Sequence, residues 1–145
     1  EGMTPRQRQI LEKWIGTPYA YRMREPGQGV DCVSLVVAIV EELHEGLSIP
    51  VLAYPRFWRH SDPALFERAA AALRGVWREI AETETRFGDV VFFQDKASEL
   101  RWITHSGVVV EPGRFIHVLN DSNGRVRIDP LEPCREQIRL FGRVL

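Results

Sequence analysis

Apolar residues repeat along this chain with two different periods, and the change between them outlines the fold. Near the N-terminus the spacing is i, i+3, i+4, which is typical of a helix that packs one face. Thr4 and Pro5 precede this pattern as an N-cap and a first helical residue. We therefore expect a short helix through Trp14 and Ile15. Its packed face comprises Ile10, Leu11, Trp14 and Ile15.

A longer apolar run from Val33 to Val40 predicts a buried helix of about four turns, which Gly46 ends. Asp31 is then the natural N-cap, and Cys32 lies in the first turn. Unpaired amides and the positive end of the helix dipole stabilise a thiolate, which lowers a thiol pKa and makes the sulfur nucleophilic. On this segment alone, a buried cysteine that packs as a small hydrophobe is an equal alternative.

Alternation with a period of two predominates in the second half and predicts an antiparallel sheet of about five strands. Residues 76–80 fit either a short strand or a connector. Between the two halves, the pattern predicts an irregular aromatic segment over 47–60 and a helix over 64–73 that Gly75 ends. The expected strands follow the turn at 86–89 and then occupy 103–110, 115–119, 126–129 and 138–144.

Two histidines lie on neighbouring expected strands, joined by the tight turn at residues 111–114. If that turn is a simple one, His105 and His117 lie at similar heights, and their side chains could face the same side of the sheet. A thiol nucleophile requires a base, and the base requires a partner that fixes its tautomer and orientation. Cys32, His105 and His117 supply these roles in that order, although either histidine alone is more often a satisfied strand residue.

Five blocks of the sequence resemble the NlpC-type cysteine peptidases, in the family's order and with comparable gaps, from about Trp14 to the C-terminus. They are 16–21 (GTPYAY), 29–36 (GVDCVSLV), 88–93 (GDVVFF), 105–108 (HSGV) and 113–117 (GRFIH). The resemblance implies a papain-like α+β domain, with the nucleophile helix packed on the sheet.

For the site, the resemblance implies Cys32 as nucleophile, His105 as general base and His117 as the residue that orients it. It also implies that Tyr19 lines the site near the oxyanion, and that Asp31 contributes to substrate binding. Within the family, the chain is most similar to short cell-wall peptidases from phage and prophage tail gene clusters. The implied substrate is a peptidoglycan stem-peptide bond such as D-γ-glutamyl to diaminopimelate.

One position departs from the pattern of the wall-recycling members. They carry Ser and then Gly after the cysteine, where this chain has Val33 and Ser34. In some members the Asp before the cysteine and the Ser after it hold a free peptide amine. Val33 removes half of that clamp, whereas an apolar residue there is frequent in the phage-tail group. Strict specificity for stems with a free L-Ala terminus is therefore not expected.

Length and composition set the outer limits. The 145 residues predict one domain over 3–145, with Glu1 and Gly2 as a cloning remnant. A net charge of −1 without a basic tract gives no drive toward nucleic acid or anionic membranes. No apolar stretch is long enough for membrane insertion, and no signal peptide is expected because the N-terminus opens polar and charged. We therefore expect synthesis in the cytoplasm, with delivery to the wall by lysis, by a phage tail with its proteins as partners, or by a toxin system.

The remaining cysteine and histidines suggest no further chemistry. Two cysteines make no disulfide framework, and Cys134, in a polar stretch without a base-like neighbour, is interpreted as a structural or incidental thiol. His44, near a helix end, and His60, in a loop, show no metal-ligand spacing with the others, so no metal or cofactor is expected. Three alternatives stay open: an amidase or acyltransferase on another substrate, a structural tail component with dispensable activity, and a toxin delivered against competitors.

Overall fold

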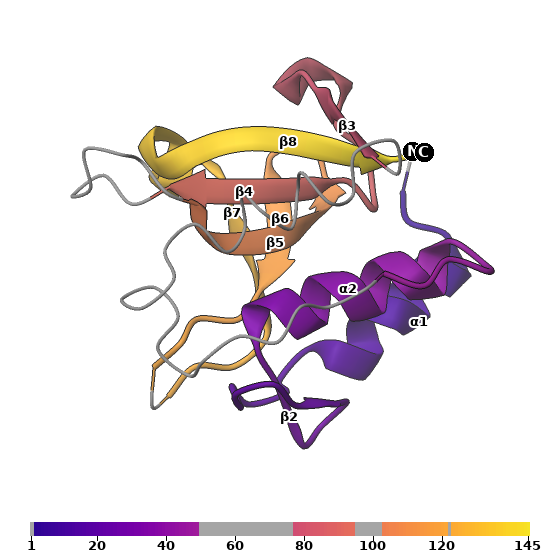
Figure 1. Ribbon diagram of the computed structural model, residues 1–145, viewed down its shortest axis with the longest axis vertical. Helices are drawn as coiled ribbons and strands as arrows, with labels where there is room; N and C mark the ends of the chain where they lie inside the picture. The colour runs from indigo at the N-terminus through magenta and orange to yellow at the C-terminus, as the bar shows by residue number, and fades with distance from the viewer. Residues whose placement is uncertain (1, 50–76, 95–102, 122) are drawn as a thin grey trace.

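The computed structural model of the protein describes residues 2–49, 77–94, 103–121 and 123–145. The predicted helix over 64–73, most of the aromatic segment over 47–60, and His60 lie outside the described residues. Two helices and a large antiparallel sheet make up the described part, and α1 and α2 lie on the same side of that sheet (Figure 1). The predicted α+β architecture is confirmed.

Helix α1 (Pro5–Trp14) begins where the sequence predicts. The Thr4 side chain accepts the Gln7 backbone N–H, and the Gln7 side chain accepts that of Thr4, which forms a reciprocal capping box. Helix α2 (Cys32–Leu43) follows Asp31 as N-cap and ends at His44, two residues before Gly46 with its positive φ of 83°. Both predicted starts are therefore confirmed.

The sheet has six strands in the order β3-β8-β4-β5-β6-β7, all antiparallel. Residues 77–80, for which the sequence allowed either a strand or a connector, form β3, which pairs with β8 at one edge of the sheet. A second, unexpected sheet is the small hairpin of β1 (Arg24–Glu25) and β2 (Gly29–Val30) within the glycine-rich loop before α2. The main sheet comprises β3 (Trp77–Ile80), β4 (Val90–Gln94), β5 (Ile103–Glu111), β6 (Arg114–His117), β7 (Arg127–Pro130) and β8 (Ile138–Val144).

The two faces of the sheet have separate apolar cores because successive strand residues point to opposite faces. One core joins the sheet to both helices through residues such as Val108, Ile116, Leu35 and Ile39. The other gathers Val91, Phe93, Val109, Phe115, Phe141, Ile80 and Leu131. Leu131 directly precedes the 3-10 turn Glu132–Gln137 that follows β7. Burial on both faces holds the central strands β4 and β5 firmly, at about 1.5–3 kcal/mol for each large apolar side chain.

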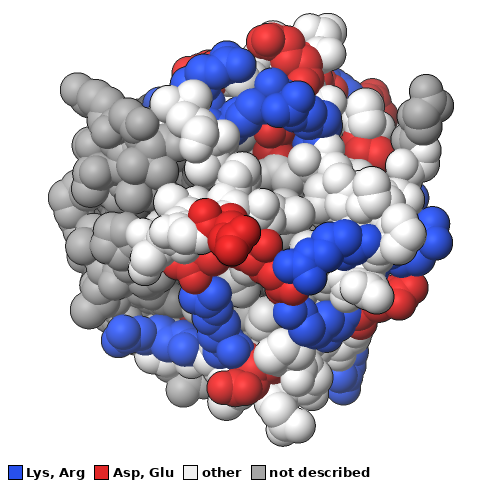
Figure 2. All heavy atoms as spheres, turned by 90° about the vertical axis from the view of Figure 1, so that its right-hand side faces the viewer, with Lys and Arg blue, Asp and Glu red and all other residues white. Residues whose placement is uncertain are grey.

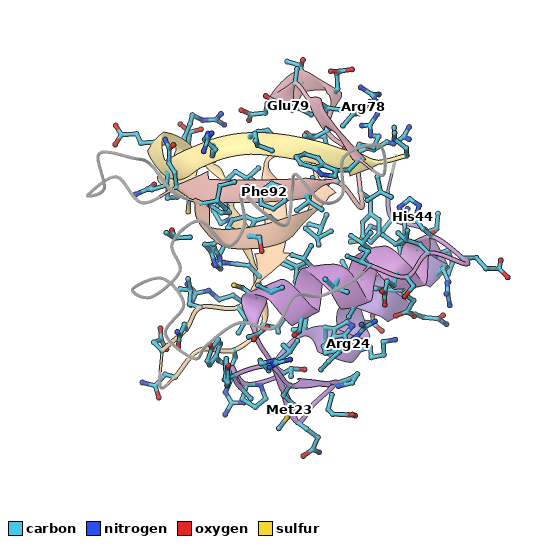
Figure 3. All side chains as sticks on the ribbon, viewed as in Figure 1. Met23, Arg24, His44, Arg78, Glu79 and Phe92 are labelled. Carbon is cyan, nitrogen blue, oxygen red and sulfur yellow. The ribbon has the colours of Figure 1, made fainter. Side chains whose placement is uncertain are left out.

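The glycine-rich hairpin is fixed to α2 by an ion pair. Arg24, the first residue of β1, lies next to α2 (Figure 3), and its Nη2 is 2.7 Å from Oε1 of Glu41. The other oxygen of Glu41 accepts the backbone N–H of Ile49 at 2.7 Å. Although burial raises the pKa of Glu41, these hydrogen bonds and the Arg24 charge lower it by more. The pair is half-exposed, so its contribution is about 1 kcal/mol or less.

Charges of both signs are interspersed over the described part of the face shown in Figure 2. This agrees with the net charge of −1. Within the described ranges, the structure contains no helix long and apolar enough to cross a membrane.

Candidate active site

Asp31 joins the start of α2 to the preceding loop. Its Oδ1 accepts the backbone N–H of Ser34 at 2.8 Å, which caps the helix. Its Oδ2 accepts the backbone N–H of Arg22 at 2.7 Å, and Asp31 itself is only 3% exposed. Arg22 is the non-glycine residue with a positive φ, 56°, among the described residues. A carboxylate with one backbone amide on each oxygen therefore fixes both segments around Cys32.

Tyr19 is held close to the same segment by backbone contacts. It forms a bridge with Val30, two residues before Cys32, and its backbone N–H donates to the Gly124 carbonyl at 2.8 Å. The structure thus places the Tyr19 backbone beside the chain that leads into α2. Its role near an oxyanion stays a prediction.

Cys32 occupies the first turn of α2, is 7% exposed and forms no disulfide. The Ser106 hydroxyl donates to the Cys32 backbone carbonyl at 3.5 Å. Ser106 directly follows His105 on β5, so this contact places the start of α2 beside the strand that carries the predicted base. The contact joins the first turn of α2 to β5, although Cys32 and Ser106 are 74 residues apart in the sequence.

His105 and His117 are hydrogen-bonded to each other, with Nε2 of His105 2.8 Å from Nδ1 of His117. His117 is 4% exposed. Its ring lies against that of Phe115, with centroids 4.1 Å apart, while the His105 ring contacts Phe93 at 5.4 Å. These aromatic neighbours restrict the ring planes of both histidines.

The route to this contact differs from the prediction of a simple turn. The pairing runs Val109 with Phe115 but then Glu111 with Arg114, so β5 carries one extra residue, Val110, as a bulge. Without the bulge, His117 would pair with Val108, whose side chain points to the face opposite to that of His105. A shift of one residue in the register changes the face. The expectation of a shared face was right, but the reason given for it was wrong.

The bulge also sets the relative heights of the two histidines. With Val108 paired to Ile116, His117 falls beside Gly107, two residues from His105 along β5. A Cβ at Gly107 would lie 3.2 Å from Cβ of His117 and 2.7 Å from the Phe115 ring. The two histidines are therefore diagonal neighbours and not directly opposite, and glycine at 107 leaves room for the side chains of Phe115 and His117.

Asp129, which the sequence reasoning did not select, extends the pair on the next strand. Its Oδ2 is 2.7 Å from Nε2 of His117, and Nε of Arg127 donates to the same oxygen at 2.7 Å. In the register of β6 and β7, Asp129 lies opposite Phe115 and Arg127 opposite His117. The signal was present in the sequence: Asp129 follows His117 by twelve residues, as His117 follows His105, on an expected neighbouring strand.

Burial and hydrogen bonding set the charge states in this row. Burial lowers the pKa of His117 and outweighs the Asp129 carboxylate, which raises it. Burial raises the pKa of Asp129, but hydrogen bonds from His117 and Arg127 lower it by more. At neutral pH the row therefore contains a neutral imidazole at His117 and an ionised carboxylate at Asp129. This arrangement can hold a second imidazole in one tautomer and stabilise it when it gains a proton.

The other thiol has a different environment. Cys134 is half-buried in the turn after β7, and burial together with the Asp129 charge raises the pKa of its thiol. His44 lies at the C-terminal end of α2. In the part of the chain that the structure describes, no three His, Cys, Asp or Glu side chains gather as a metal site would require.

A model of the NlpC/P60 family matches residues 16–141, which include all five site residues predicted from the sequence. The chain belongs to the NlpC/P60 family. Two curated Bacillus subtilis (strain 168) proteins are similar to it. Gamma-DL-glutamyl hydrolase is 29% identical over 108 residues, 74% of this chain and 21% of its own length. The bifunctional muramidase/DL-endopeptidase CwlT is 28% identical over 134 residues, 91% of this chain and 34% of its own length.

This NlpC/P60 chain thus spans about a fifth and a third of those relatives. Solved structures share its fold. The NlpC/p60 domain of the peptidoglycan hydrolase SagA matches with a TM-score of 0.61 and 17% identity, over 95% of this chain and 96% of that one. An NlpC/P60 family protein from Bacillus cereus ATCC 10987 matches with a TM-score of 0.67 and 20% identity, over 99% of this chain and 41% of that one.

Proposed function

We propose that this domain is a cysteine hydrolase that cleaves an amide bond in the stem peptides of peptidoglycan. The observation that carries the proposal is the hydrogen-bonded pair of His105 and His117 on the strands beside the start of the Cys32 helix. Membership of the NlpC/P60 family supports it, as do the names of the relatives, one a DL-endopeptidase and one a gamma-DL-glutamyl hydrolase.

In the proposed reaction, His105 takes the thiol proton of Cys32 and the thiolate attacks the carbonyl carbon of the scissile amide. Backbone N–H groups at the start of α2, with the Tyr19 hydroxyl, stabilise the oxyanion of the tetrahedral intermediate. The protonated His105 then gives its proton to the leaving amine as the C–N bond breaks. Water, deprotonated by His105, hydrolyses the thioester and regenerates the thiol. His117 holds the His105 ring throughout.

The bond that we propose is the one between D-γ-glutamate and diaminopimelate. Both relatives' names contain the term DL, one for a gamma-glutamyl hydrolase and one for an endopeptidase, and this stem bond is a γ-glutamyl bond of a D residue. The chemistry of Cys32 and His105 alone would serve an amidase or acyltransferase equally well.

Residues next to the nucleophile bear on which stems are accepted. Val33 is half-buried and packs against Ile103 with Tyr21. Both oxygens of Asp31 already accept a backbone N–H. A clamp for a free N-terminal ammonium therefore lacks the hydroxyl at 33, although each Asp31 oxygen keeps a lone pair for a further donor. This supports action on stems still attached to glycan, which suits an enzyme that opens intact wall from a phage tail.

Digestion of purified sacculi, followed by mass spectrometry of the released fragments, tests the proposal. We expect new N-terminal diaminopimelate on the products, and no release by Cys32→Ala. Cys134→Ala is the matched control and should release the same products as the parent. Release of glycan fragments with intact stems, or undiminished release by Cys32→Ala, would refute the proposal. Retained infectivity of a virion carrying Cys32→Ala would favour a structural tail component.

A further inference from the structure

The row of hydrogen-bonded side chains that begins with His105 and His117 continues to Asp129 on a third strand. His105, His117 and Asp129 lie on the neighbouring strands β5, β6 and β7. His105 is two residues from Gly107, which lies beside His117, and Asp129 is two residues from Arg127, which pairs with His117. Diagonal neighbours of this kind lie within reach of long side chains. The resulting contacts, 2.8 Å and 2.7 Å, form one continuous hydrogen-bonded chain.

The direction of the hydrogen bonds follows from the chemistry of the last member. An ionised carboxylate only accepts hydrogen bonds, so Nε2 of His117 must carry the proton that it shares with Asp129. A neutral imidazole has one N–H, which leaves Nδ1 of His117 as an acceptor. The only group that can then donate across the 2.8 Å contact is Nε2 of His105. A neutral His105 protonated at Nε2 has its basic lone pair on Nδ1.

We propose that Asp129 is a positioning residue that sets the tautomers of both histidines and so makes Nδ1 of His105 the base. This inference rests on the proposed function for its catalytic meaning, although the tautomers themselves do not depend on it. When the Cys32 thiol transfers its proton to Nδ1, His105 becomes an imidazolium. The negative charge of Asp129, transmitted through neutral His117, favours that cation.

Arg127 has a separate function in the same cluster. Its guanidinium donates to the carboxylate oxygen that His117 uses, and its side chain is largely exposed. It therefore holds Asp129 in place without entering the chain of imidazoles. Removing Arg127 leaves the carboxylate as an acceptor for His117, whereas replacing Asp129 by Asn offers His117 an amide that can donate instead. These two changes separate the carboxylate's hydrogen-bonding role from local packing.

The decisive measurement is long-range ¹H–¹⁵N NMR of the histidine rings, made on the full chain with Cys32→Ala so that activity plays no part. We expect both His105 and His117 to be protonated at Nε2. With Asp129→Asn added, we expect His117 to acquire an Nδ1–H population and His105 to lose its single tautomer. Arg127→Gln should keep Nε2–H on both rings. Unchanged tautomers in folded Asp129→Asn would overturn the inference.

Kinetics on the chain with Cys32 intact give the second readout. We expect Asp129→Asn to lower kcat about tenfold or more with KM changed less than about twofold, because the defect lies in the base and not in substrate binding. Asp129→Glu, which keeps the carboxylate, should recover most of kcat and the parent tautomers. If Asp129→Asn unfolds, Asp129→Ala replaces it, because it also removes the carboxylate. If Asp129→Asn has the same kcat as Asp129→Glu, the inference is overturned. Full activity of Cys32→Ala would instead refute the proposed function and leave the tautomer result standing.

Discussion

Asp31 and Arg22 are joined by a 2.7 Å hydrogen bond from the Arg22 backbone N–H to a carboxylate whose other oxygen caps α2. One side chain thereby holds a left-handed residue and a helix start in fixed relation. The consequence is that the loop around Arg22 and the start of α2 cannot move independently.

Asp31→Ala should lower the free energy of unfolding by about 2–3 kcal/mol, because it removes a cap and strands a second amide. Urea unfolding followed by circular dichroism measures the change. Asp121→Ala is the control, since Asp121 accepts one backbone N–H from Asn123 at an exposed turn. We expect a loss below about 1 kcal/mol there. Equal losses for the two variants would contradict the double role of Asp31.

The two thiols offer a test in which exposure and electrostatics predict opposite results. Cys134 is the more exposed, but burial and the Asp129 charge raise the pKa of its thiol. Cys32 is 7% exposed but lies at a helix N-terminus beside the histidine strands. Iodoacetamide at neutral pH should therefore alkylate Cys32 much faster than Cys134. Peptide mapping after limiting alkylation gives the ratio, and faster labelling of Cys134 would remove Cys32 as the nucleophile.

The two histidines should differ in what their loss costs. His105→Ala should abolish turnover nearly as fully as Cys32→Ala, since no other group would deprotonate the thiol. His117→Asn should keep measurable turnover, because an amide can accept from Nε2 of His105. Steady-state rates on a muropeptide, with thermal unfolding to verify the fold, decide the matter. Equal inactivity of the two folded variants would contradict the assigned roles.

Stability should depend on pH through His117. Its folded pKa is lowered, by burial first, so the unfolded chain binds a proton before the folded chain does as pH falls. Stability should therefore rise with pH between the folded pKa and the ordinary value of 6.5. His117 faces Asp129, Arg127 and His105 there. Urea midpoints from pH 5 to 7 should show this slope, and His117→Asn should flatten it, whereas His44→Asn should not.

Substrate choice should reflect Val33. If the ammonium clamp is halved, kcat/KM on a muropeptide still attached to glycan should be about equal to that on the free tetrapeptide beginning in L-Ala. A buried ammonium without acceptors costs several kcal/mol, so a complete clamp of Asp and Ser would favour the peptide with the free amine. A hundredfold preference for the free tetrapeptide, or about 2.7 kcal/mol, would restore a recycling role. Val33→Ser should move the ratio toward the free peptide.

The sequence predicted the local features well because local rules govern them. Thr4 and Asp31 are N-caps, and each capping hydrogen bond reaches only three residues along the chain. Family resemblance and strand alternation together brought His105 and His117 into one cluster. Asp129 was missed because its importance arises from a diagonal across β6 and β7, and alternation alone does not give the register between strands. The β1–β2 hairpin was missed because its strands are only two residues long.

Val110 gives the site a dependence on residue count. An odd change in the number of residues between His105 and His117 would carry one imidazole through to the reverse side of the sheet, even if every side chain kept its identity. An even change would keep both on one side and merely slide one past the other. The contact between the two imidazoles thus depends on whether the number of residues between them is odd or even. Single-residue insertions and deletions there are therefore more damaging than most substitutions.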